Sequence, residues 1–253
     1  LMVNNDERMI QHICFNIDRS GSMSGKESDT VGGINTMINE LKENKKNNEE
    51  IYISVKLFDH EEVLKLRKMK IEEIYPFTLA DFKPRGQTAL LDALGSSLNY
   101  FMQEKIKNPN MFKKCLIVTS TDGLENCSKN FTSSQIKSMI FEANEKYNID
   151  CIYLGANQDA ILHANNIGIA AECAINYDET AENIQAVYRS AASVANRVRT
   201  GERPSFTNVE RQSSQPTSPP SYNRAIEVPR IARQQAQSLS QTYATPIHRS
   251  ATR

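Results

Sequence analysis

Short apolar runs alternate with longer segments of mixed character along the chain. The apolar runs have the length of strands and are bounded by turn residues, which is typical of strands buried on both faces of a parallel sheet. These runs are residues 10–17, 51–58, 115–119, 150–154 and 173–176. Residues 63–69 alternate in part and follow the second run at hairpin distance, so we expect an antiparallel edge strand there.

The segments between these runs carry apolar residues at three- and four-residue spacing, the pattern of amphipathic helices. Thr132 is followed three positions later by Gln135, which predicts a capping box at the start of one helix. Five helices are predicted. They are one that ends near Glu43, one at Ala89–Gln103, one at residues 132–147, a short one that ends at Ile167, and one at Glu179–Arg197. Strands that alternate with helices predict an α/β fold: a doubly wound, mostly parallel six-stranded sheet with one antiparallel edge strand and helices on both faces.

The composition of the chain changes near residue 200. Six of the nine prolines follow this point, among Ser, Gln, Thr and Arg residues. Such a segment cannot bury enough apolar surface to offset the entropy lost on ordering. We therefore expect one folded domain at residues 8–199 and a disordered tail rich in Arg, Ser, Pro and Gln at residues 200–253.

The 30 basic and 30 acidic side chains cancel over the whole chain but not within its two parts. The first 200 residues carry a formal charge of −4 and the last 53 carry +4, with seven arginines against three acids. The domain therefore has no electrostatic signature of a protein that binds nucleic acid or an anionic membrane. The basic tail leaves a separate function open, a scaffold that binds RNA or an acidic partner.

The five cysteines are odd in number, form no C-x-x-C pair and mostly lie in apolar runs. This pattern argues against a disulfide framework and a zinc site, and it favours a reducing compartment. No apolar run approaches the ~20 residues of a membrane span, and the first residues lack the pattern of a secretory signal. We expect a cytoplasmic protein without a membrane span.

Oxygen-bearing side chains stand at the ends of three predicted elements. Asp18, Ser20 and Ser22 follow the first strand, Thr88 precedes a helix, and Asp122 follows the strand at 115–119. Ligands of open α/β sheets bind outside the carboxyl ends of the strands, where the strand order reverses. If the two strands are neighbours there, these five side chains meet in one crevice. Two carboxylates and three hydroxyls, without His or Cys, suit a hard divalent cation such as Mg²⁺.

The same residues form the pattern D-x-S-G-S, a loop threonine and T-D-G. This pattern resembles the metal-ion-dependent adhesion site (MIDAS) of von Willebrand factor type A (vWA) domains, and all five positions match. The predicted order of strands and helices over residues 10–198 is similar too. The segments G-Q-T-A-L-L-D-A and L-G-A-N-Q-D-A resemble those of stand-alone intracellular vWA proteins of bacteria, phages and large DNA viruses. The resemblance does not extend to residues 200–253.

The resemblance implies a bound Mg²⁺, with Mn²⁺ as a second candidate, at Asp18, Ser20, Ser22, Thr88 and Asp122. It also implies that the hydroxyls contact the ion directly, that the carboxylates act mostly through water, and that a partner's Asp or Glu takes the open position. A cation with few anionic ligands attracts an external anion, which agrees with that arrangement. We therefore expect a non-enzymatic module that binds a protein partner through a metal ion.

A Mg²⁺-dependent hydrolase or phosphotransfer enzyme that uses the same carboxylates is the alternative. Against it, no second Asp stands two residues after Asp18, no P-loop exists, and residues 21–25 have Met23 where the pattern G-x-S-x-G needs a serine. The histidines are expected in core or surface positions rather than as catalytic bases. They are His12, His60, His163 and His248.

Three further polar residues lie near the predicted site. Asp59, at the end of the second strand, is either a support for the metal ligands or a turn residue that opens a hairpin. Asp92 is expected on a solvated face of a helix. Arg19 is expected to point outward, either toward an acidic partner or simply into solvent.

Overall fold

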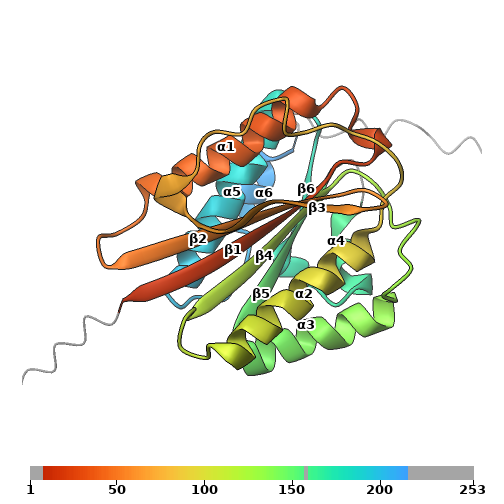
Figure 1. Ribbon diagram of the computed structural model, residues 1–253. Helices are drawn as coiled ribbons and strands as arrows, with labels where there is room; N and C mark the ends of the chain where they lie inside the picture. Colours follow the sequence, from red (N-terminus) through yellow and green to blue (C-terminus); the bar gives the residue numbers. More distant parts are fainter. Residues whose placement is uncertain (1–7, 157–158, 216–253) are drawn as a thin grey trace, which may run out of the picture. The chain divides into compact units, whose positions relative to one another are not determined.

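Six strands form a single sheet in a computed structural model that describes residues 8–156 and 159–215. Their order across the sheet is β3-β2-β1-β4-β5-β6 (Figure 1), and all neighbours are parallel except β2 and β3, which are antiparallel. This arrangement confirms the predicted sheet and its antiparallel edge strand. The strands are β1 Met9–Asp18, β2 Glu49–Phe58, β3 Glu62–Lys70, β4 Lys114–Thr121, β5 Ile149–Ala156 and β6 Ala174–Tyr177.

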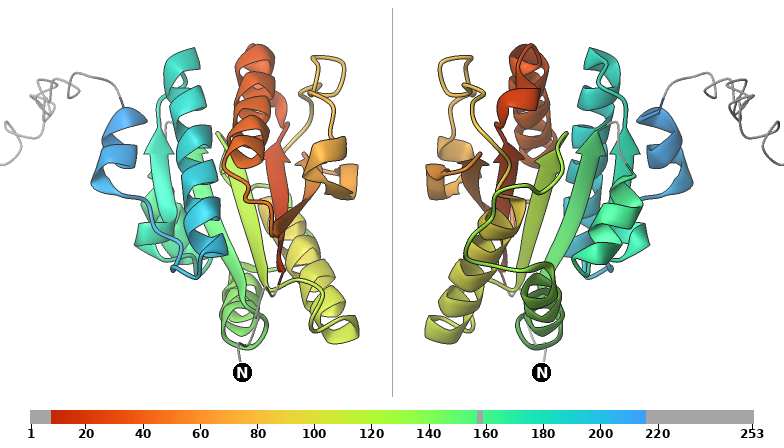
Figure 2. Two further views of the ribbon diagram at one scale, coloured as in Figure 1. Left: turned by 90° about the vertical axis from the view of Figure 1, so that its left-hand side faces the viewer. Right: turned by 90° about the vertical axis from the view of Figure 1, so that its right-hand side faces the viewer.

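Helices cover both faces of the sheet. Helices α1 and α5 lie side by side on one face, while α2 and α3 pack together on the other (Figure 2). Within the described ranges, no helix is both long and apolar enough to cross a membrane. The helices are α1 Glu27–Glu43, α2 Leu90–Lys107, α3 Ser133–Tyr147, α4 Ala160–Asn166, α5 Ala181–Arg199 and α6 Asn208–Ser213.

The central strands are buried because both faces of the sheet are covered. Every residue of β5 is buried, as are all but the first residue of β4, whereas the edge strand β3 has none in the buried class. This explains why the central strands are continuous apolar runs and β3 is not. The predicted capping box also forms, since Thr132 and Gln135 bond reciprocally at the start of α3.

Residues 200–215, which the sequence pattern assigns to the tail, pack against the domain. Phe206 is only 5% exposed, and Arg197 at the end of α5 forms an ion pair with Glu210 of α6 at 2.9 Å. Arg211 donates to the backbone oxygen of Ala174 at 2.7 Å, which places α6 along β6 at the sheet edge. Phe206 and the contacts of Arg197 and Arg211 therefore connect residues 200–215 to the domain. The rest of the predicted disordered tail, residues 216–253, lies outside the described residues.

The strand order reverses between β1 and β4. From β1 the chain builds outward to β2 and β3, and from β4 it builds in the opposite direction to β5 and β6. The loops that leave the carboxyl ends of β1 and β4 therefore diverge, and ligands of open α/β sheets generally bind at such a point. Asp18 is the last residue of β1 and Asp122 directly follows β4, so the fold brings both carboxylates to this point.

Candidate metal centre

Asp18 lies fully buried at the end of β1. Its Oδ1 accepts the backbone N–H of Ser20 at 2.6 Å, and its Oδ2 accepts the hydroxyl of Thr121 at 2.5 Å. Burial raises the pKa of the Asp18 carboxyl to about 6, and the nearby Asp122 adds to the rise, although the bonds from Thr121 and Ser20 oppose it. A buried carboxylate with a raised pKa gains from a cation beside it.

The loop after β1 turns so that two serines lie next to each other. A short 3-10 turn at Gly21–Met23 buries Met23, and Gly21 N–H donates to the oxygen of Gly86 at 3.1 Å. The hydroxyl oxygens of Ser20 and Ser22 are then 3.1 Å apart. This loop therefore rests on the loop that precedes α2.

Thr88 is held from the opposite side by the loop that follows β4. Its N–H donates to Asn126 Oδ1 at 2.9 Å, and Asn126 N–H donates back to the oxygen of Thr88 at 3.1 Å. Thr88 is nearly fully buried. The reciprocal pair fixes the position of the Thr88 backbone relative to the Asp122 loop.

Asp122 connects the β4 loop to the β1 loop and to α1. Its Oδ1 accepts the Ser22 hydroxyl at 2.6 Å, and its Oδ2 pairs with Lys26 Nζ at 2.5 Å. Lys26 also forms an ion pair with Glu179, just before α5. Partial burial lowers the pKa of the Lys26 ammonium, but the bonds to Asp122 and Glu179 outweigh it and raise the pKa above its ordinary value.

Oxygen atoms from three loops converge on one point beside Gly123. A Cβ atom on Gly123 would lie 3.0 Å from Thr88 Oγ1, 3.5 Å from Ser22 Oγ and 3.6 Å from Asp18 Oδ2. Together with the contacts of Ser20 and Asp122, this places the five predicted residues in one cluster. An all-oxygen cradle that a methyl group would fill suits a hard divalent ion such as Mg²⁺. Their role as metal ligands stays a prediction.

Asp59 contacts both the loop after β1 and the loop that contains Thr88, which agrees with the interpretation of this residue as a support for the candidate ligands. Its Oδ2 lies 2.9 Å from Arg19 Nε in the β1 loop and 2.9 Å from Arg85 Nε in the Thr88 loop. Arg85 N–H also donates to the oxygen of Arg19 at 2.8 Å. Arg19 is therefore buried against Asp59, and the expectation that it points outward is wrong. The buried carboxylate draws the guanidinium inward.

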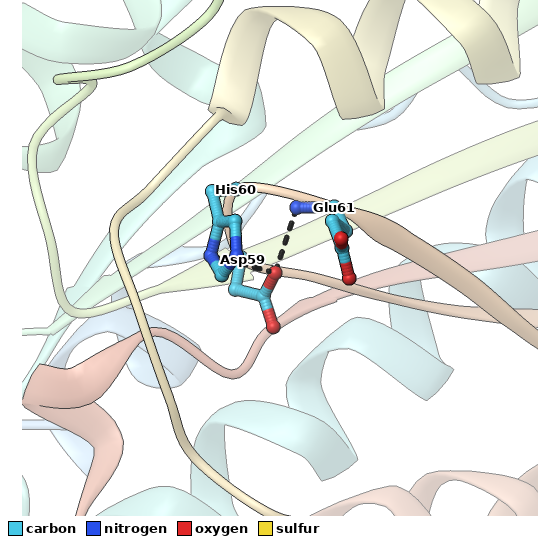
Figure 3. Close-up of side chains that lie close together, drawn as sticks. All are labelled: Asp59, His60 and Glu61. Atoms are coloured by element: carbon cyan, nitrogen blue, oxygen red, sulfur yellow. Dashed lines mark hydrogen bonds and ion pairs between the residues drawn. The ribbon is translucent and has the colours of Figure 1, made fainter.

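Asp59, His60 and Glu61 lie close enough together to share a cation (Figure 3). Asp59 Oδ1 accepts the N–H of Glu61 at 2.7 Å, which confirms the interpretation of Asp59 as a turn residue. Arg19 and Arg85 already neutralise Asp59, and Arg85 also pairs with Glu61. Two fixed guanidinium charges make this cluster a poor cation site compared with the cradle at Gly123.

Asp92 organises the loop after β4, and its prediction as part of a solvated helix face is wrong. The residue is 9% exposed and accepts backbone N–H groups from Lys129 and Asn130 at 2.9 Å and from Phe131 at 3.1 Å. Its position in the first turn of α2 fits both a solvated and a buried carboxylate. Only the fold shows that a loop of N–H donors passes beside it.

The surroundings of His12 and His60 indicate structural roles for both side chains. His12 is buried in β1 among aromatic rings. The centroid of its imidazole ring lies 4.6 Å from that of the Phe101 ring and 4.9 Å from that of the Phe112 ring. Burial, with a contribution from Lys68, lowers the pKa of His12 to about 3. His60 packs against the Asp59 carboxylate at 3.3 Å. His12 matches the expected core position; His248 lies outside the described residues.

No family model and no curated protein matches the sequence. Solved structures do match the fold. The vWF domain of the type V pili tip protein Mfa5 from Porphyromonas gingivalis has a TM-score of 0.54 at 12% identity, over 79% of this chain and 99% of that chain. Proximal thread matrix protein 1 from the mussel byssus, with a zinc-occupied MIDAS motif, has a TM-score of 0.53 at 15% identity, over 75% and 46%.

A von Willebrand factor type A protein from Catenulispora acidiphila has a TM-score of 0.52 at 11% identity, over 74% of this chain and 43% of that chain. The chain thus spans less than half the length of the mussel and Catenulispora chains. The sheet order, the helices on both faces and the similarity to these structures therefore show that this chain has the vWA fold. At these identities the likeness concerns the fold, and the site must be judged on its own residues.

Proposed function

We propose that this protein is a divalent-metal-dependent protein-binding module that captures an acidic side chain of its partner. The observation that carries the proposal is the convergence of oxygen atoms from three loops beside Gly123. The ligands would be Asp18, Ser20, Ser22, Thr88 and Asp122, and the ion Mg²⁺ or Mn²⁺. The zinc-occupied MIDAS of the similar mussel protein supports a divalent ion in general.

The charge distribution of the site favours an external acidic ligand. Both oxygens of Asp18 and both oxygens of Asp122 already accept hydrogen bonds or an ion pair from neighbouring groups. The remaining ligands are neutral hydroxyls. An ion held in this way keeps much of its positive charge, because its anionic neighbours are shared with other donors. A partner's Asp or Glu would supply the missing anionic ligand.

We propose a non-enzymatic role because the cluster offers acceptors and hydroxyls but no activated nucleophile. Ser22, the most accessible hydroxyl, donates to a carboxylate of the cluster itself, and within residues 8–156 and 159–215 no histidine hydrogen-bonds to it. A Mg²⁺-dependent hydrolase or phosphotransfer enzyme remains the alternative to be tested. Turnover of generic phosphoesters that is lost with Asp18→Asn would support it.

Thermal melting of the full chain with Mg²⁺, Mn²⁺ or EDTA tests the metal site. An ion that binds only the native state raises the melting temperature by mass action. We expect a rise for the wild type and for Asp29→Asn, a matched acidic control in α1. We expect no rise for Asp122→Ala. Equal rises in Asp122→Ala and the wild type would refute the proposed ligands.

Binding to a peptide array tests partner capture. Peptides that contain Asp or Glu are compared with their Asn or Gln counterparts, in Mn²⁺ and in EDTA. We expect binding only for the acidic peptides and only with the metal. Binding that survives EDTA, or that does not distinguish carboxylates from amides, would contradict the acidic-ligand mechanism. Loss of binding when residues 216–253 are removed would instead favour the basic tail.

The cytoplasmic location stays a prediction.

A further inference from the structure

Lys26 sits between two carboxylates at the proposed metal site. Its Nζ pairs with Asp122 Oδ2 at 2.5 Å and with Glu179, which stands just before the start of α5. The Asp122 side chain is 2% exposed, whereas those of Lys26 and Glu179 are 23% and 21% exposed. The Lys26 ammonium therefore lies at the outer boundary of the cluster, where it contacts the almost inaccessible carboxylate of Asp122.

Lys26 lies at the start of a helix, where a lysine side chain is unfavourable. Lys26 is the N-cap residue of α1, and its side chain makes no capping bond. N-cap positions favour side-chain acceptors such as Ser, Asn or Asp, and a positive charge at a helix N-terminus opposes the helix dipole. A residue that violates local preference in this way is expected where function requires it. The two carboxylates provide the compensating interactions.

We propose that Lys26 is the internal counter-cation of the metal site and determines its affinity for divalent ions. The inference rests on the proposed function, because it assigns a role to Lys26 at the same site. Without a divalent ion, the ammonium compensates the buried Asp122 carboxylate. When an ion binds, two cations share Asp122 and repel each other. The ammonium then shifts toward Glu179, which offers it a second anionic partner.

The proposal makes opposite predictions for the loss of Lys26 and for the loss of its second partner, Glu179. Removing the ammonium removes the repulsion and leaves Asp122 to the metal alone, so divalent ions should bind more tightly. Removing the Glu179 carboxylate takes away the ammonium's other partner, so the ammonium stays on Asp122 and divalent ions should bind more weakly. A purely structural contact would weaken metal binding in both cases, because either change would loosen the cluster.

Calorimetric titration of Mn²⁺ into the full-length protein tests these signs, with melting in EDTA as a second readout. We expect Lys26→Met to lower the Kd for Mn²⁺ about tenfold, since a unit charge beside a divalent ion contributes on the order of one tenfold step. The same variant should melt at a lower temperature in EDTA. Lys26→Arg should stay close to the wild type, because the charge is kept.

Glu179→Gln should raise the Kd for Mn²⁺ a few-fold, and Asp178→Asn is the matched control for a neighbouring charge. In the double variant with Lys26→Met, the effect of Glu179→Gln should largely vanish, because it acts through the ammonium. An unchanged or raised Kd in Lys26→Met would overturn the inference while leaving the proposed function intact. Absence of Mn²⁺ binding in the wild type and in Lys26→Met would overturn both. If Lys26→Met does not fold, an unchanged Kd in Glu179→Gln overturns the inference.

Discussion

Gly123→Ala places one methyl group next to three of the oxygens of the proposed metal site. The new carbon would lie 3.0 Å from Thr88 Oγ1, 3.5 Å from Ser22 Oγ and 3.6 Å from Asp18 Oδ2. Mg²⁺ needs oxygen ligands at about 2.0–2.1 Å in a near-octahedral arrangement. The methyl group therefore excludes the ion from part of the space between these oxygens, without removing any proposed ligand.

The size of the effect follows from mass action. A divalent ion at about 100 times its Kd stabilises the native state by ~2.7 kcal/mol, which for a domain of this size corresponds to a rise in melting temperature of about 5–11 °C. Loss of one ligand contact weakens binding about tenfold. At the same ion concentration the stabilisation falls by roughly 1.3 kcal/mol, and the rise becomes about 3–5 °C smaller.

Thermal melting of Gly123→Ala in EDTA and in Mn²⁺ measures both quantities. The melting temperature in EDTA should change little, because Thr88 Oγ1 needs to move only a few tenths of an ångström. Gly32→Ala is the control, since its Cβ would meet no atom within 4 Å and its metal response should equal that of the wild type. A full metal-induced rise in Gly123→Ala would mean that the ion binds elsewhere.

Two further predictions concern the core. Because the pKa of buried His12 is lowered to about 3, the unfolded chain takes up a proton below pH ~6.5 that the folded protein does not. The contribution of His12 to stability should therefore fall as the pH drops from ~6.5 toward 3, by about 2 kcal/mol between pH 7.5 and 5. It is measured as the difference in pH dependence between the wild type and His12→Phe in urea unfolding, because the raised pKa of Asp18 acts in the opposite direction in both proteins. Gly33→Ala would place its methyl group 2.4 Å from Cδ2 of the buried Tyr188 ring where α1 meets α5. It should cost about 1–3 kcal/mol in urea unfolding, and a cost no larger than that of Gly32→Ala would show that the helices separate freely.

The fold was predictable because its signals are local and repeated. Apolar runs of strand length, helical spacing and the Thr132 capping box each agree with the sheet order that the structure has. The five candidate ligands were also predictable as a set, since each follows or precedes an element whose end the pattern locates. What brings them together is the strand reversal between β1 and β4, which the sequence suggests only through resemblance.

The errors arose where distant residues decide the outcome. Arg19 looked like a solvent-facing loop residue, but Asp59, forty positions away, draws it into the protein. Asp92 looked like a surface residue of a helix, but the loop at 129–131 surrounds it with N–H groups. No local pattern announces such long-range partners. The same holds for Phe206, a single apolar residue in a segment of polar composition that nevertheless packs against the domain.

Two of the buried carboxylates at this edge of the sheet, Asp59 and Asp122, have counter-ions of different kinds, and the difference indicates where a metal ion can bind. Asp59 is paired with two arginines, whose planar groups remain charged and hold several donors in fixed geometry. Asp122 is paired with Lys26, a compact charge on a flexible stem that already shares a second carboxylate. The Asp59 cluster therefore acts as a permanent clamp between loops, whereas the cation at Asp122 is exchangeable. A divalent ion should accordingly bind at Asp122 rather than at Asp59, although the Asp59 cluster also contains a second carboxylate and an imidazole.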